Sequence, residues 1–144
     1  MIISSLDNSK IKNLNKLKNK KYREENKKFI VEGEHLIKEA FKSGCLIEVI
    51  KIENIDFDMD IPTTIVTEEV MKKISYLESP NGLLGVCKFS EENKEIGNKL
   101  LLLDDIQDPG NLGTIIRSCV AFNVSTLVIS NNTVDIYNDK VLRS

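Results

Sequence analysis

The sequence predicts an α/β protein, with a small α/β unit at its N-terminus followed by the start of a second unit built on a parallel sheet. Short apolar runs of strand length alternate with amphipathic helical patterns along residues 1–89. A polar stretch, residues 90–99, then separates this series from a new apolar run at 100–103. That run is followed by a helical pattern and by another apolar run at 127–129, an order typical of a βαβ unit with parallel strands.

The first predicted element is a helix over residues 8–20. Ile11, Leu14 and Leu17 recur at a spacing of three among lysines, which gives one apolar face. Asn8 precedes this pattern and is a good N-cap residue.

A polar loop, a strand and a second helix are expected next. The loop covers residues 22–26 and the apolar strand covers 29–31, which Gly33 ends. Residues 34–43 then have one apolar face, and Gly44 suits a left-handed C-cap.

Three strands and one helix are expected in the remainder of the first unit. Strands are expected at 46–52 and 65–66, separated by an acidic loop at 53–62. Thr67 is expected to cap a helix whose apolar positions are Val70, Met71 and Ile74.

A turn at residues 79–82 and a strand at 83–89 complete the first unit. We therefore predict a first domain at 1–90, a linker at 91–99 and a second domain at 100–144.

Charge is distributed unevenly along the chain. Residues 1–28 hold nine Lys or Arg against three Asp or Glu, a net charge of +6, whereas the other 116 residues have a net charge of −8. A basic end on an acidic body suits a local contact with a polyanion, and it equally suits a solvated, lysine-rich helix. The candidate phosphate contacts are Lys20, Lys21, Arg23, Lys27 and Lys28.

The three cysteines, Cys45, Cys87 and Cys119, lie far apart among apolar residues and form no C-x-x-C pair. They are expected to be buried thiols in a reducing compartment, with no metal site. No apolar run approaches ~18 residues, so we expect a soluble, cytoplasmic protein without a membrane partner.

One arginine stands out in the second unit, because Arg117 is the only charged residue between Asp108 and Asp135. Such a residue either extends to solvent or has a function. Asn111 occupies the expected N-cap of its helix. The segment reads Asp108-Pro109-Gly110-Asn111-Leu112-Gly113-Thr114-Ile115-Ile116-Arg117.

This segment resembles the first motif of the SpoU family, D-P-x-N-x-G-x-x-x-R, in five identities. The family comprises SPOUT-class RNA ribose 2′-O-methyltransferases. The N-terminal half resembles the family's substrate-binding domain in Lys21-Tyr22-Arg23, in Phe29-Ile30-Val31-Glu32-Gly33 and in Ser79-Pro80-Asn81-Gly82. The resemblance implies a domain related to small ribosomal proteins, followed by an incomplete domain of the trefoil-knot type.

The resemblance also implies a function. It implies methyl transfer from S-adenosylmethionine to ribose in RNA, with ribosomal RNA the expected partner, and a homodimer for a full-length member. Arg117 and Asn111 are the implied catalytic residues. Since the pKa of arginine exceeds ~12, we expect Arg117 to stabilise the developing oxyanion rather than to accept a proton.

Further candidate RNA contacts follow from helix positions and from the chain's last residues. Gly33 begins a helix, where a phosphate can bind, although two flanking glutamates argue against it. Tyr22 either stacks on a base or anchors the first helix. Lys140 and Arg143 belong to residues 137–144, which resemble the start of a further family segment. His35 has no evident partner and is expected to be structural or to face solvent.

The family's later motifs, which bind the cofactor and form the knot, do not occur before Ser144. We therefore expect an N-terminal portion of a longer methyltransferase, inactive alone and without a cofactor site. The alternative is a non-catalytic, ribosome-associated RNA-binding protein. A nucleotide-binding α/β domain of another kind is less favoured, because no G-x-G-x-x-G or P-loop follows a strand.

Overall fold

The computed structural model describes residues 1–92 and 95–144, so the predicted linker at 91–99 includes two residues outside the described part. The chain forms two compact units, Met1–Ser90 and Glu91–Ser144. Each is described below by itself.

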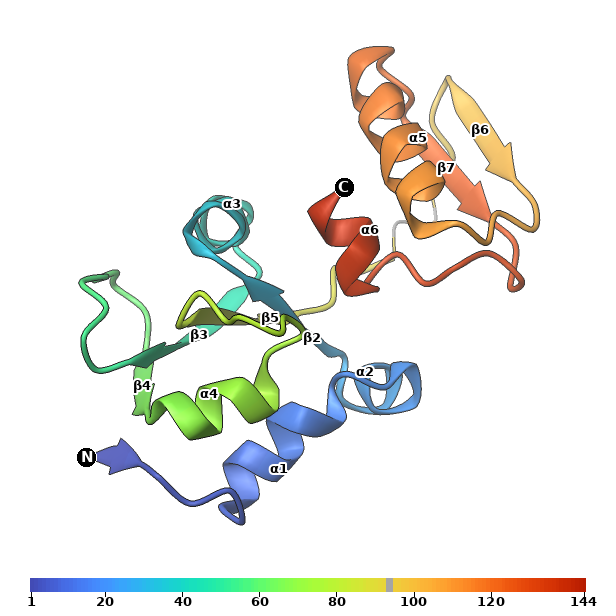
Figure 1. The fold of residues 1–144 in the computed structure, drawn as a ribbon. Helices are drawn as coiled ribbons and strands as arrows, with labels where there is room; N and C mark the ends of the chain where they lie inside the picture. Colours follow the sequence, from blue (N-terminus) through green and yellow to red (C-terminus); the bar gives the residue numbers. More distant parts are fainter. Residues whose placement is uncertain (93–94) are drawn as a thin grey trace. The chain divides into compact units, whose positions relative to one another are not determined.

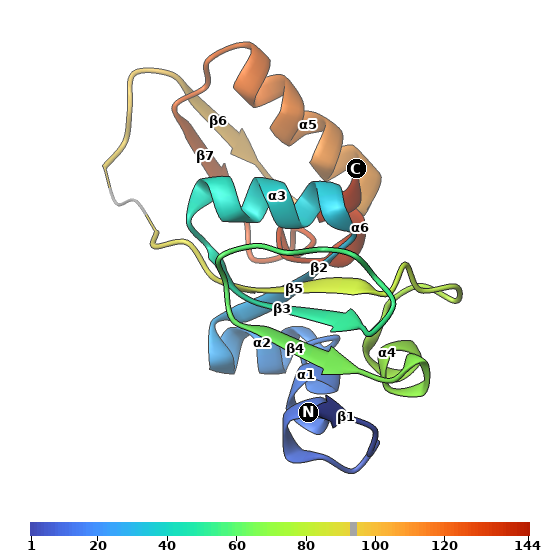
Figure 2. The same cartoon turned by 90° about the vertical axis from the view of Figure 1, so that its left-hand side faces the viewer.

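The first unit is a mixed five-stranded sheet with helices on both faces (Figures 1 and 2). The sheet order is β1-β4-β3-β5-β2, with β5 antiparallel to both of its neighbours and the β1–β4 and β3–β4 pairs parallel. The strands are β1 (Ile2–Ile3), β2 (Lys28–Glu32), β3 (Leu46–Ile52), β4 (Thr63–Val66) and β5 (Leu83–Lys88).

The main core of this unit lies between the sheet and helices α1 and α4, while α3 covers the opposite face (Figure 2). Ile11, Leu14 and Leu17 are buried there, which confirms the predicted apolar face of the first helix. The helices are α1 (Ser9–Lys16), α2 (Lys20–Asn26), α3 (Glu34–Ser43) and α4 (Glu68–Ile74).

The single helix predicted at 8–20 is wrong in its second half, and so is the loop predicted at 22–26. Asn8 does cap α1, since its side chain accepts a hydrogen bond from the Lys10 amide. However, Asn19 has an extended backbone and caps a separate helix, α2, by accepting from the Lys21 amide. An extended residue cannot continue a helix, so the chain turns there and residues 20–26 start a new one.

Several other local predictions are confirmed. Gly44 ends α3 in the left-handed conformation at φ +78°, and the Thr67 hydroxyl caps α4. The strand β1 was not predicted; its two residues pair in parallel with β4. A two-residue strand is too short to produce a recognisable alternation in the sequence.

The second unit contains the predicted parallel βαβ arrangement. β6 (Leu100–Leu103) and β7 (Thr126–Ile129) pair in parallel and are connected by α5 (Pro109–Ala121). A short helix, α6 (Asp139–Arg143), packs against α5 and contributes Val141 to a small core with Leu103 and Leu112.

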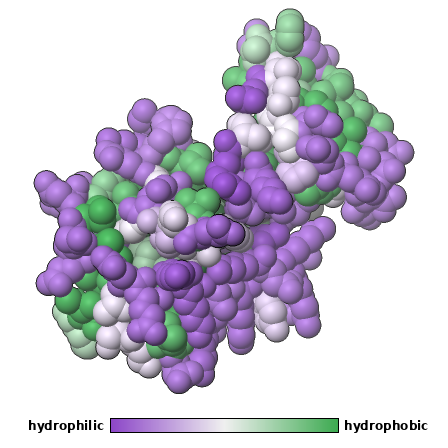
Figure 3. All heavy atoms as spheres, viewed as in Figure 1, coloured by the Kyte–Doolittle hydropathy of each residue, from purple (hydrophilic) through white to green (hydrophobic). Residues whose placement is uncertain are grey.

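Apolar side chains remain exposed in the second unit, where the surface shows green patches in Figure 3. Its large exposed apolar residues include Leu100, Leu102, Val120, Phe122 and Val128. Across residues 1–92 and 95–144, no helix has the length and apolar content needed to cross a bilayer.

The three cysteines are free thiols. Cys87 and Cys119 are buried as predicted, but Cys45 is only partly buried. Among the described residues, no group of three potential ligands is placed to hold a metal ion.

Candidate functional site

The turn that leads into α5 is capped by Asp108, and the prediction that Asn111 is the N-cap is wrong. Asp108 Oδ1 accepts a hydrogen bond from the Asn111 amide at 3.0 Å, and Pro109 takes the first helical position. Aspartate is a strong N-cap residue and proline suits that first position, so the helix begins three residues earlier than predicted. The Asn111 side chain is therefore exposed and is not used in capping.

Arg117 lies on the exposed surface of α5 and forms no hydrogen bond or ion pair with any residue that the structure describes. Arg117 follows Asn111 by six positions in the helix. This spacing places the two side chains roughly 120° apart around the helix axis, with about 9 Å of rise between them. The two side chains therefore do not share a helix face, and Asn111 does not orient Arg117 directly. A ligand of nucleotide size is needed to touch both.

Gly113 lies where α6 approaches α5 most closely. A Cβ atom at this position would stand 1.7 Å from Ser144 Oγ and 3.1 Å from the Val141 carbonyl oxygen. The absent side chain thus makes room for the chain's own final helix.

The two cations of α6 differ in their contacts. Arg143 Nη2 donates to Asp139 Oδ2 at 2.7 Å within the same helix, so its charge is already paired. Lys140 is exposed and has no ion pair with the described residues. Of the two predicted RNA contacts here, Lys140 is the more available.

In the first unit, the structure removes Arg23 from the candidate phosphate contacts. Its side chain is 4% exposed, and Nη1 donates to the carbonyl oxygens of Leu17 and Lys18 at 3.1 and 3.0 Å. The guanidinium thereby joins the end of α1 to α2. A cation held in this way stabilises the fold and cannot reach an RNA phosphate.

The neighbouring lysines are exposed around a partly buried tyrosine. The ammonium groups of Lys16 and Lys21 lie 5.4 and 5.7 Å from the centre of the Tyr22 ring, a cation–π arrangement. Lys20 forms an exposed ion pair with Glu24. Such a surface pair is weak and is readily exchanged for a phosphate contact.

The last two lysines of the basic segment lie at the start of β2. Lys27 has a left-handed backbone and caps α2, and its ammonium lies 5.9 Å from the Phe89 ring centre. Lys28 is exposed and lines a hollow in the first unit.

Gly33 begins α3 as its N-cap, as predicted, and the phosphate contact predicted there stays a prediction. Its N–H donates to the Leu83 carbonyl oxygen across the sheet at 3.0 Å. Its φ of +94° is the left-handed conformation that favours glycine. Gly33 therefore turns the chain from β2 into α3. His35 in that helix is exposed, as predicted.

Glu32 is a buried carboxylate whose role the sequence analysis missed. It accepts hydrogen bonds from the Ser75 hydroxyl and from the Tyr76 amide, and so fixes the segment after α4 to β2. Burial lowers the pKa of the Lys18 ammonium, and the Glu32 carboxylate offsets part of that effect. Glu32 and Ser75 are 43 positions apart in the sequence, which explains why no local pattern predicts this contact.

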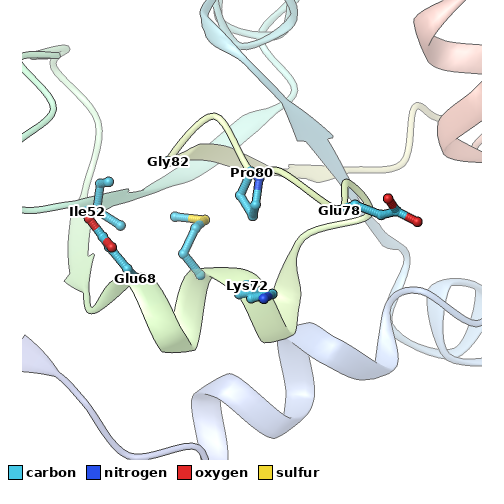
Figure 4. Close-up of a pocket in the computed structure, with 7 residues that line it drawn as sticks. Ile52, Glu68, Lys72, Glu78, Pro80 and Gly82 are labelled. Carbon is cyan, nitrogen blue, oxygen red and sulfur yellow. The ribbon is translucent and has the colours of Figure 1, made fainter.

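The turn predicted at 79–82 borders a hollow of about 330 Å³ opposite α4 (Figure 4). Glu68 and Lys72 project from α4, and Pro80 projects from the turn. Gly82 has a φ of +77°, and a Cβ there would lie 2.8 Å from Ile52. Only glycine fits this tight return into β5.

A smaller hollow in the second unit, of about 180 Å³, is lined mainly by apolar side chains such as Leu101, Ile115 and Phe122. Sites for small molecules are usually ~300 Å³ or larger and contain a few convergent polar groups. This hollow is therefore smaller and more apolar than such sites usually are.

Comparison with known proteins assigns both units to described families. Residues 8–85 match the MRM3-like substrate binding domain, and residues 98–144 match the SpoU rRNA Methylase family. The first match lies within the first compact unit, and the second match lies within the second unit.

The similar proteins are longer than this chain. The 23S rRNA (guanosine(2553)-2′-O)-methyltransferase RlmP of Bacillus subtilis is 36% identical over 147 residues, which cover 99% of this chain and 59% of that protein. The human mitochondrial rRNA methyltransferase 3 is 29% identical, over 89% of this chain and 34% of its own length.

A solved structure has the same fold over this length. The AdoMet-bound rRNA methyltransferase from Sinorhizobium meliloti superposes with a TM-score of 0.79 at 25% identity, over 99% of this chain and 59% of that one. The α/β architecture described above is thus that of the matched portion of such enzymes.

Proposed function

We propose, from the premise that this chain belongs to the SpoU rRNA methylase family, that it is part of a ribosomal RNA ribose 2′-O-methyltransferase. In this proposal the MRM3-like substrate-binding domain binds the RNA, and the second unit supplies the arginine that faces the ribose. The observation that carries this proposal is Arg117, exposed on α5 without a partner among the described residues, in a segment matched to the family. We also propose that the first unit is the ribosomal-protein-like domain and that the second is part of a trefoil-knot domain.

Arg117 acts on the ribose hydroxyl through its charge. As the 2′-oxygen attacks a methyl group it loses its proton and gains negative charge, which a fixed guanidinium stabilises. Arginine keeps its proton at neutral pH, so a different group or water accepts the hydroxyl proton. Asn111, with its side chain free of the cap, is placed to contact a neighbouring part of the same nucleotide.

S-adenosylmethionine is the proposed methyl donor, because a structural relative is described as AdoMet-bound. The hollow in the second unit is too small and too apolar for this molecule. The homodimer and the cytoplasmic location stay predictions, since relatives of similar identity include mitochondrial proteins.

A second function, RNA binding without catalysis, is favoured by the exposed lysines of the first unit. Lys16, Lys20 and Lys21 lie in α1 and α2 and do not depend on Arg117. In that case changes at Lys20 and Lys21 weaken RNA binding, and changes at Arg117 have no consequence.

The decisive experiment compares Arg117→Ala and Arg117→Lys in the complete product of the native gene. Transfer of labelled methyl groups from S-adenosylmethionine to 23S rRNA is measured beside RNA affinity. We expect Arg117→Ala to lower the rate by about 10²-fold or more with little loss of affinity. We expect Arg117→Lys, which keeps the charge, to retain part of the rate. An unchanged rate in Arg117→Ala would overturn the assignment and leave the second function.

A further inference from the structure

A polar hollow of about 400 Å³ lies in the first unit between α1, the end of α2 and strands β2, β3 and β5. Leu14, Leu17 and Val86 form its apolar floor, and Asn13, Asn26 and Lys28 belong to its rim. This volume is within the range of ligand sites and suits one nucleotide. All of these residues belong to the first compact unit.

The acidic residue that lines the hollow is already neutralised. The Glu48 carboxylate accepts from the Lys10 ammonium and from the Thr64 hydroxyl. Its charge is therefore balanced within the fold, and Lys28 gives the rim a positive charge. Such a rim attracts an anionic ligand rather than a cation.

A second lysine lies directly opposite Lys28 on the neighbouring strand. Lys28 of β2 and Lys88 of β5 are register partners in the antiparallel pair. Backbone hydrogen bonds join Phe89 to Lys27 and Gly33 to Leu83 at the two ends of this strand pair, so the hydrogen-bonded pairs fall at odd-numbered positions of β2. Lys28 and Lys88 thus form a non-hydrogen-bonded pair, in which side chains on one face are closest.

No ion pair with a described residue balances the charges of this lysine pair. Both side chains are exposed, and neither forms an ion pair or hydrogen bond with a residue that the structure describes. Like charges placed directly opposite each other destabilise a sheet. Lys88 shares its face with Val86, which belongs to the floor of the hollow. An anion bound between the two ammonium groups would relieve their repulsion.

We propose that this hollow binds one nucleotide of single-stranded RNA, with its phosphate on Lys28 and Lys88. The proposal rests on the proposed function only in taking RNA as the ligand. The apolar floor accepts the face of an unstacked base or ribose. The side-chain amides of Asn13 and Asn26 then lie beside the polar edges of that base. A base within a duplex is stacked and paired and cannot enter such a hollow.

The test uses the 144-residue chain and a fluorescently labelled single-stranded oligoribonucleotide, with affinity measured by anisotropy over a range of salt concentrations. We expect the double variant Lys28→Gln/Lys88→Gln to bind about tenfold more weakly at low salt. The slope of log affinity against log salt should fall by about 0.7, since the two lysines hold one phosphate and each phosphate contact on a single strand contributes ~0.7. The matched control is Lys38→Gln/Lys42→Gln, two lysines of α3 on the opposite sheet face.

A second variant separates binding from folding. Lys88→Glu places a carboxylate opposite Lys28 and replaces repulsion with attraction, so its midpoint of thermal unfolding should rise while RNA affinity falls. A variant that binds RNA poorly because it is partly unfolded would instead have a lower midpoint of thermal unfolding than the wild type.

Four results would overturn the proposal. The control pair could weaken binding as much as the lysine pair, or the lysine pair could leave affinity unchanged. Duplex RNA of the same sequence could bind as tightly, or inorganic phosphate could compete as well as the oligonucleotide, which would indicate an ordinary anion site. In each of these cases wild-type RNA binding persists and the proposed function stands. A wild-type chain that binds no RNA at low salt would overturn both.

Discussion

Arg23 and Arg117 show how differently two arginines function in this chain. Arg23 is in a basic segment but is buried and bonded to backbone carbonyl groups. Arg117 is in an apolar segment but is exposed. A guanidinium has five N–H donors, so it can close a buried corner as readily as it can bind a phosphate. Sequence composition does not distinguish these two uses, and the hydrogen-bond partners do.

Replacement of Arg23 should therefore affect stability and not RNA contact. We expect Arg23→Ala to lower the free energy of unfolding by about 2–3 kcal/mol, because two buried hydrogen bonds from a charged group are lost. Lys21→Ala, at the exposed neighbouring position, should change it by less than ~0.5 kcal/mol. Urea denaturation followed by circular dichroism measures both. Equal stability of the two variants would contradict the structural role of Arg23.

The buried thiol of Cys87 should make stability depend on alkaline pH. Burial raises the pKa of this thiol far above its ordinary value, and the nearby Cys45 adds to the rise. Below about pH 8.5 the thiol is protonated in both the folded and the unfolded chain. As the pH rises further, the unfolded chain loses this proton and the folded chain keeps it, so the folded state becomes less stable.

Cys87→Val removes this group while keeping a side chain of similar size. We expect the free energy of unfolding to fall less steeply above pH 9 in Cys87→Val than in the wild type, as measured by urea denaturation. Cys119→Val, at the buried thiol of the second unit, is the control. If both variants follow the wild-type pH dependence, the Cys87 thiol does not contribute to it.

The helix ends were predicted well where the pattern offers a single capping position, and less well where the pattern continues across a break or offers two capping residues. Asn8, Gly44 and Thr67 act as predicted because each bonds within its own turn. The break at Asn19 was missed, since the lysine-rich pattern continues across it and the contacts of Arg23 favour the turn. Similarly, Asp108 rather than Asn111 caps α5, two good N-cap residues being only three positions apart.

At the scale of the elements, the contact between α5 and α6 depends on the missing side chain of Gly113. We expect Gly113→Ala to lower the free energy of unfolding by about 1–3 kcal/mol, because the new methyl group would overlap Ser144 and α6 must move. Ser118→Ala on an exposed turn of the same helix should have almost no effect or a slightly stabilising one.

A second-site change gives this prediction its control. Ser144→Gly removes the atoms nearest to the new Cβ, so it should restore part of the stability of Gly113→Ala while changing the wild type little. Chemical denaturation of the four variants completes a double-mutant cycle. Additive effects would show that the two residues do not interact.

For the whole chain, the sequence predicted the parallel βαβ unit and the order of the longer strands and helices, because periodicity reports which face of an element is buried. It did not predict β1, α2 or α6. It did not predict the five-strand order of the first sheet, which depends on contacts between distant residues. Among the candidate site residues, exposure at Arg117, Lys21 and Lys28 agrees with a binding role. Lys88 was missed, because its importance arises only from the register that places it opposite Lys28.

The two units also differ in how completely they bury apolar surface, and this difference can be measured on the intact chain. Leu102 and Phe122 in the second unit are 66% and 69% exposed, and exposed apolar surface binds hydrophobic dyes. We expect Leu102→Gln/Phe122→Gln to reduce the fluorescence of bound anilinonaphthalene sulfonate. Phe41→Gln, at a residue of the first unit that is 43% exposed, should reduce it much less. Equal reductions would mean that isolated exposed residues, rather than the surface of the second unit, bind the dye.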